Sequence, residues 1–150
     1  MEVLTGDTLA EALLFCSQQE NVSVCVVLDN MRNTKELVET LWREIELGNL
    51  PGWVMQRGFD VASFSNTYSI LNTKKSSALY FITAYDARDF KGRTFNRILY
   101  LSDLNTVILS EIEHCEQPLR FTDGTYGGEE LDEFLSGFKI KPAASAVRAI

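Results

Sequence analysis

The sequence predicts one α/β domain with a mostly parallel sheet, flanking helices and one hairpin. Three observations predict it. Residues 22–28 are almost all apolar and largely β-branched, as a strand buried on both faces requires. An amphipathic helical pattern follows over residues 33–47. Two more apolar runs, at residues 78–83 and 98–101, flank a charged loop. Buried strands that alternate with helices are typical of parallel sheets with right-handed crossover connections.

Length and composition indicate a single domain. The chain has 150 residues, 45% of them hydrophobic, which is enough for one core. We expect this domain at residues 1–138 and a flexible tail at residues 139–150, which have alanine and serine around Pro142. No run reaches the roughly 18 apolar residues of a membrane span, and no secretory signal is recognisable. The odd number of widely spaced cysteines predicts buried reduced thiols and a cytoplasmic location.

Two capping boxes mark the starts of the predicted helices. The residue pairs are Thr8 with Glu11 and Asn33 with Glu36. We expect the first helix to continue to about Gln19. The second continues to about Leu47, where Gly48, Asn49 and Pro51 follow and end it.

The other expected elements are short. The strands are expected at residues 2–4, 53–55, 68–71, 78–83 and 98–101, with the third and fourth joined as a hairpin across residues 72–77. Residues 107–115 and 129–136 are candidate helices, separated by a glycine-rich loop at residues 117–128.

Three stretches carry a resemblance to a known family. They are Thr5-Gly6-Asp7-Thr8 ahead of a helix, VCVVLDN at residues 24–30, and ARDFKGRTFNRILYLSD at residues 87–103. Over residues 5–105 the order of elements resembles the central core of P-loop ATPases of the phage terminase large-subunit and helicase type. The resemblance implies a Rossmann-like, degenerate P-loop NTPase-like fold. It also implies a vestigial nucleotide site at Gly6, Asp7, Thr8 and Asp103.

Two departures from the family pattern argue against hydrolysis. A phosphate loop needs several glycines and a lysine, whereas this chain has one glycine and places Asp7, which repels phosphates, at the lysine position. The acidic pair that holds Mg²⁺ and orients water is replaced by Ser102 and Asp103. We therefore expect no catalytic residue, metal or cofactor. The simpler interpretation of Thr8 is a helix cap, and that of Asp103 is the polar end of a strand.

The charged loop at residues 85–96 is the predicted interaction surface. Basic side chains alternate there with two phenylalanines, and arginine beside exposed aromatic residues is typical of interface hot spots. Two strands could also be joined by far fewer residues. The competing interpretation is that the phenylalanines pack into the core and anchor the loop. The residues of the predicted interaction loop are Arg88, Phe90, Lys91, Arg93, Phe95 and Arg97.

These patterns favour binding over catalysis. The first hypothesis is a catalytically inactive ATPase-like domain, encoded by a phage or prophage, that acts through macromolecular binding as an interaction, inhibitor or virion-associated packaging protein. It would reside in the host cytoplasm or the virion. Its partner is expected to be an unidentified protein, because a net charge of −7 opposes direct binding of DNA. No membrane partner is expected.

Two alternatives stay open. One is an atypical or split nucleotide hydrolase linked to DNA packaging or processing, with its missing residues supplied by another chain. The other is a module that binds a small ligand or nucleotide without hydrolysis. Its site would lie at the carboxyl edge of the sheet, near Asp29 and Asn30 and near Ser102 and Asp103, where open α/β sheets place ligands.

Overall fold

The computed structural model describes residues 1–47, 59–64, 68–90, 92–102, 104 and 112–117. In chain order the elements are β1 (Glu2–Val3), α1 (Gly6–Gln18), β2 (Ser23–Leu28), α2 (Met31–Leu47), β3 (Phe59–Phe64), β4 (Tyr68–Thr73), β5 (Ala78–Thr83), the 3₁₀ helix η1 (Ala84–Phe90), β6 (Arg97–Tyr100) and the 3₁₀ turn η2 (Glu113–Cys115). Within these residues, no helix is both long and apolar enough to cross a membrane.

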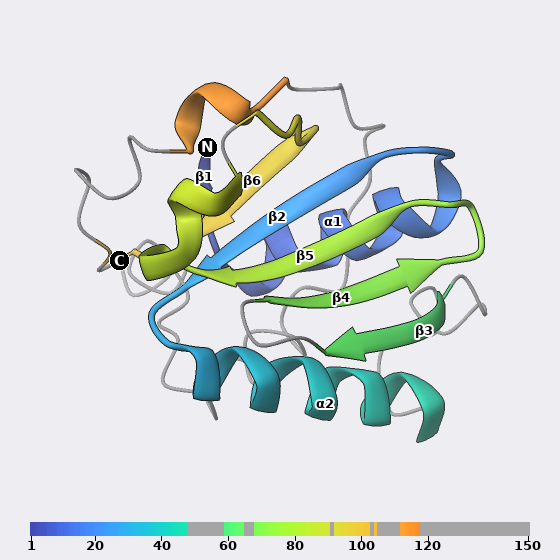
Figure 1. Ribbon diagram of the computed structural model, residues 1–150. Coiled ribbons are helices and arrows are strands. Elements are labelled where there is room, and N and C mark those ends of the chain that lie inside the picture. Colours follow the sequence, from blue (N-terminus) through green and yellow to red (C-terminus); the bar gives the residue numbers. More distant parts are fainter. Residues whose placement is uncertain (48–58, 65–67, 91, 103, 105–111, 118–150) are drawn as a thin grey trace, which may run out of the picture.

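The strands form one mixed sheet in the order β1-β6-β2-β5-β4-β3 (Figure 1). β1, β6, β2 and β5 run parallel to one another. At one side of the sheet β4 pairs antiparallel with β5, and β3 pairs antiparallel with β4. The prediction of an α/β fold with a mostly parallel sheet and a β4–β5 hairpin is confirmed. β2 and β5 pair along their whole length in the centre, which explains their nearly continuous apolar sequences.

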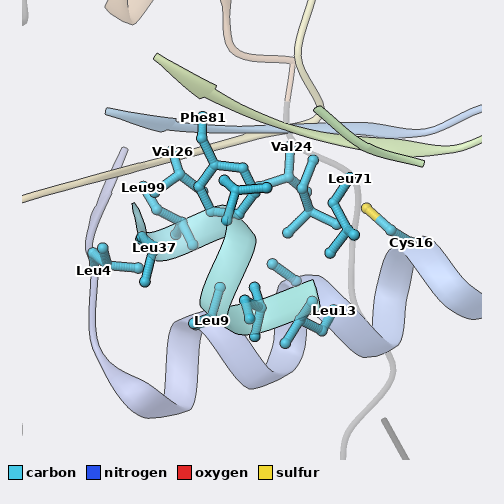
Figure 2. Packing of buried hydrophobic residues seen from close by; sticks show 14 of the residues in the cluster. Leu4, Leu9, Leu13, Cys16, Val24, Val26, Leu37, Leu71, Phe81 and Leu99 are labelled. Carbon is cyan, nitrogen blue, oxygen red and sulfur yellow. The ribbon is translucent and has the colours of Figure 1, made fainter. Parts of the chain in front are cut away.

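Both long helices cover the same face of the sheet. Alternate residues of β2, Val24 and Val26, point to this face, where Leu9 and Leu13 of α1 and Leu37 of α2 meet them (Figure 2). All five side chains are fully buried or nearly so. This cluster is the larger of the two hydrophobic clusters among the described residues, and it packs both helices against the parallel strands.

In the part of the chain that the structure describes, the opposite face of the sheet is covered by the segment between β5 and β6 and by η2, without a long helix. The segment between β5 and β6, residues 84–96, is here called the crossover segment. β5 and β6 are parallel and β2 lies between them, so this segment must cross β2 on its way (Figure 1). Phe90 and Phe95 of the crossover segment form a second core with Cys25, Val27, Ile82, Ala84, Ile98, Ile112 and Cys115.

The first helix begins three residues earlier than the sequence predicts. Thr5 is the N-cap: its Oγ1 accepts a hydrogen bond from the Thr8 amide at 3.0 Å, and the Thr5 amide donates to Thr8 Oγ1 at 2.8 Å. The Thr8–Glu11 box is therefore wrong. Two threonine hydroxyls close the box as well as a threonine and a glutamate do, and they leave Glu11 available for another contact.

Two further predictions need correction. α2 begins at Met31 rather than after Asn33, and Glu36 pairs with Arg32 one turn earlier instead of capping. The strand β3 lies in a stretch that the sequence pattern assigns no strand. Its residues alternate between apolar and polar only over residues 59–61, because Ala62 follows Val61 directly, and such a short alternation is a weak strand signal. The pairing register with β4 shifts between Phe59 and Val61.

Several predictions fall outside the described residues. They are the strand at residues 53–55, the helix at residues 129–136, the tail at residues 139–150 and most of the loop at residues 117–128. Of the candidate helix at residues 107–115, the described part is the 3₁₀ turn η2.

Candidate interaction surface

The carboxyl ends of the four parallel strands lie at one edge of the sheet. This edge collects the residues that the sequence assigns to a nucleotide or ligand site. Thr5 and Gly6 follow β1, Asp29 and Asn30 follow β2, and Ser102 lies shortly after β6. The structure thus brings the predicted stretches together, while Asp103 lies outside the described residues.

At the start of α1 the residues are used by the helix cap. Only Leu4 and Thr5 separate β1 from α1, and Leu4 is fully buried. Thr8 Oγ1 also donates a hydrogen bond to the carbonyl oxygen of Val3 at 2.9 Å. Gly6 is buried in the first turn and Asp7 is half-buried. A cradle of backbone N–H groups needs a longer glycine-rich connection, so this geometry favours the cap interpretation of Thr8.

The strands β2 and β5 are neighbours, but the chain leaves their carboxyl ends toward opposite faces of the sheet. From β2 it passes through Asp29 and Asn30 into α2 on the first face, and from β5 it passes into η1 on the second face. Adjacent strands whose connections diverge in this way define a topological switch point, where open α/β sheets bind ligands. Asp29 and Asn30 are exposed there.

Tyr85 is the most exposed large hydrophobic residue among the described residues. It is 84% exposed and lies in η1, directly after the end of β5. The turn beneath it is fixed: the Thr83 hydroxyl donates to Asp86 Oδ2 at 2.8 Å, and the Asp86 amide donates to Thr83 Oγ1 at 3.2 Å. Tyr85 therefore lies on a turn that these two hydrogen bonds hold together.

The phenylalanines of the predicted interaction loop are not exposed. Phe90 is 3% exposed and Phe95 is 1% exposed, so the expectation of exposed aromatic residues is wrong at both positions. The reason is the topology. A parallel crossover needs a dozen or more residues and must bury one side against the sheet it crosses. The length of the segment and its two phenylalanines follow from this requirement, as the competing core interpretation holds.

Arg97 is not an exposed loop residue either. It is the first residue of β6, 6% exposed, and its guanidinium reaches two carboxylates. Nε donates to Glu2 Oε1 at 2.9 Å, with Nη2 on the same oxygen, and Nη1 lies 2.7 Å from Glu11 Oε2. This buried cation joins β6 to β1 and α1, a structural role that the linear sequence does not reveal.

Arg93 is the basic residue of the loop whose side chain is both described and exposed. Its guanidinium carbon lies 5.5 Å from the ring centre of Tyr80 and 5.4 Å from that of Phe90. Lys91 lies outside the described residues, and nothing is described of the Arg88 side chain. Tyr85 and Arg93 of the crossover segment are thus exposed and are here called its outer side, whereas Phe90 and Phe95, its inner side, belong to the core.

Sequence reasoning does not single out Tyr85. The available signal is an aromatic residue two positions after the end of a largely apolar strand, followed by Asp86, which can form a hydrogen bond back to Thr83. Among the described residues, no group of three or more His, Cys, Asp or Glu side chains is placed to hold a metal ion.

Comparison with known proteins gives no relative. No family model matches the chain, no curated protein matches it and no solved structure matches it.

Proposed function

We propose that this protein is a non-hydrolysing α/β domain that acts by binding another protein through the outer side of the crossover segment. The observation that carries the proposal is Tyr85, an aromatic side chain 84% exposed on a turn fixed by Thr83 and Asp86. Tyrosine and arginine are the residue types that dominate binding energy at interfaces. Arg93 presents the second of them from the same segment.

The division of the crossover segment supports a contact role for its outer side. Phe90 and Phe95 secure the segment to the sheet, so a partner meets a preformed surface and does not have to order a loop. The acidic body, with a net charge of −7, favours a protein partner over a polyanion. The resemblance to phage terminase-type ATPases makes a phage or prophage setting part of the proposal.

The non-hydrolysing part of the proposal rests on the start of α1. Asp7 occupies the lysine position of a phosphate loop, and the hydroxyl groups of Thr5 and Thr8 are engaged with each other and with backbone groups. An atypical or split hydrolase would need both the phosphate-binding lysine and the second metal-site acid from another chain.

Site-specific photo-crosslinking tests the proposal. A photoreactive benzoylphenylalanine replaces Tyr85, and a matched variant carries it at Glu39, which is exposed on α2. We expect a discrete crosslinked protein from position 85 in host cells and none of the same mass from position 39. The yield should fall at least about tenfold when Arg93→Ala is added. Equal crosslinking from both positions would reject the surface.

A second candidate is supported by the switch point between β2 and β5. In this version a small ligand or nucleotide binds without hydrolysis beside Asp29, Asn30 and Tyr85. Thermal shift across a panel of nucleotides and small acids separates the two candidates. A ligand-induced rise in Tm that Tyr85→Ser reduces and Arg93→Ala leaves unchanged would favour the small-ligand module.

A further inference from the structure

Arg93 is exposed, yet its position is fixed from two directions. Its guanidinium group lies over the rings of Tyr80 and Phe90, within the distance at which a cation is attracted to an aromatic face. Its amide donates to the Phe90 carbonyl oxygen at 3.1 Å, after a turn in which Gly92 has a φ of 88°. An arginine held in this way loses less conformational freedom when it binds a partner.

The rings beneath Arg93 are themselves held in a network. Tyr80 packs edge-on against Phe95 with ring centres 5.7 Å apart, and Phe90 packs edge-on against Tyr68 at 5.5 Å. Phe90 and Phe95 are buried in the second core. Tyr80 of the sheet and Phe90 of the crossover segment, here called the aromatic platform, are thus packed together by these ring contacts. The guanidinium of Arg93 lies over both rings.

Arg93 and Arg97 differ in the groups that contact their guanidinium charge. Arg97 is paired with Glu2 and Glu11 inside the protein. For Arg93, the described residues supply the two aromatic contacts and no carboxylate. A guanidinium that stacks by its face keeps its N–H donors at its edge, in the fork geometry that matches a carboxylate.

We propose that Arg93 receives a carboxylate group of the protein partner, from an Asp or Glu side chain or a chain terminus. This inference rests on the proposed function and names the chemistry of its contact. The acidic body of the protein opposes a polyanion, which several cations must track. A single carboxylate needs one oriented guanidinium, and Arg93 on its aromatic platform supplies it.

NMR titration of ¹⁵N-labelled protein tests the proposal, with the Arg93 Nε–H signal as the readout. The probes are two acetylated, amidated tetrapeptides that differ in one residue, Glu or Gln, then inorganic phosphate and a twelve-residue thymidine oligonucleotide. We expect a saturable shift at Arg93 with the Glu peptide. With the Gln peptide, or in Arg93→Lys, affinity should fall at least about tenfold. Arg32, exposed and paired with Glu36, is the internal control and should not shift.

The other outcomes overturn the inference. Equal shifts with both peptides, or equal shifts at Arg32, would mean that no carboxylate is recognised at Arg93. Stronger binding of phosphate or of the oligonucleotide would assign the platform to a phosphate ligand instead. Failure of the proposed function has a different signature. In that case position 85 gives no specific crosslink, whichever ligand binds Arg93.

Discussion

The guanidinium Nη1 of Arg97 and the carboxylate Oε2 of Glu11 lie 2.7 Å apart, linking the first residue of β6 to the middle of α1. The same guanidinium bonds to Glu2 of β1. Three elements from the two ends of the described chain thus meet at one buried cation. Glu11 takes part in this contact because Thr5 and Thr8 already complete the helix cap.

Removing this cation should destabilise the fold. For Arg97→Ala we expect a loss of about 2 kcal/mol in the free energy of unfolding, measured by urea denaturation. The figure is below that of a fully buried pair because the carboxylates of Glu2 and Glu11 are partly exposed and solvent screens them. Arg32→Ala removes an exposed pair and should cost less than about 0.5 kcal/mol. Equal costs for the two variants would contradict the assignment.

The capping box predicts a smaller effect at Thr5. Thr5→Ala removes the acceptor of the Thr8 amide and should lower the free energy of unfolding by about 1 kcal/mol. Thr5→Ser keeps the hydroxyl and should restore most of it. Thermal or urea unfolding of the two variants measures the difference. A neutral Thr5→Ala would show that the helix start does not depend on this cap.

The buried thiols predict how stability changes in alkaline solution. Burial raises the pKa of Cys16 well above its ordinary value of about 9. The pKa of Cys25 is raised in the same way, with a further contribution from Cys115. Above about pH 9 the unfolded chain loses these protons and the folded chain keeps them, so stability falls as pH rises.

Each such thiol contributes a slope that approaches about 1.4 kcal/mol per pH unit as the unfolded thiol becomes fully ionised. Urea denaturation between pH 9 and 10 should therefore show a shallower pH dependence for Cys16→Ala than for the wild-type protein. For each protein, the free energy of unfolding at pH 7 is the reference from which the loss at higher pH is calculated. An unchanged slope would mean that the Cys16 thiol ionises in the folded state.

Mg·ATP should leave the protein unaffected. Stabilisation by a ligand grows with its concentration relative to its Kd, so a bound nucleotide at millimolar concentration raises Tm. Because the β1–α1 connection has two residues and the resemblance aligns Asp7 with the phosphate-binding lysine, we expect no rise and no phosphate release. A rise of several degrees, or turnover that Asp103→Ala abolishes, would favour the hydrolase alternative.

The fold could be predicted from sequence where one strand or helix carries its own signal. The uninterrupted apolar run of β2 and the helical spacing of α2 are local properties, and both elements are present. β3 was not predictable in this way because its alternation of apolar and polar residues does not extend beyond Val61. The helix start at Thr5 was missed because a Thr–Thr box lacks the usual acidic partner.

The candidate surface depends on tertiary relationships that no local pattern contains. Whether Phe90 faces a partner or the core is decided by β2 lying between β5 and β6. Arg97 is buried because Glu2 and Glu11, distant in the sequence, neutralise it. The carboxyl edge was predictable, since strand ends can be read from the sequence, but the exposure of Tyr85 was not.

The central claim is that the crossover segment has an inner side that belongs to the core and an outer side free to bind. The free energy of unfolding of Phe90→Ser, compared with that of Tyr85→Ser, tests it most directly. Phe90 is 3% exposed and Tyr85 is 84% exposed. We expect a loss of roughly 3 kcal/mol or more for Phe90→Ser and less than about 0.5 kcal/mol for Tyr85→Ser. A small loss for Phe90→Ser, or a large one for Tyr85→Ser, would contradict the account.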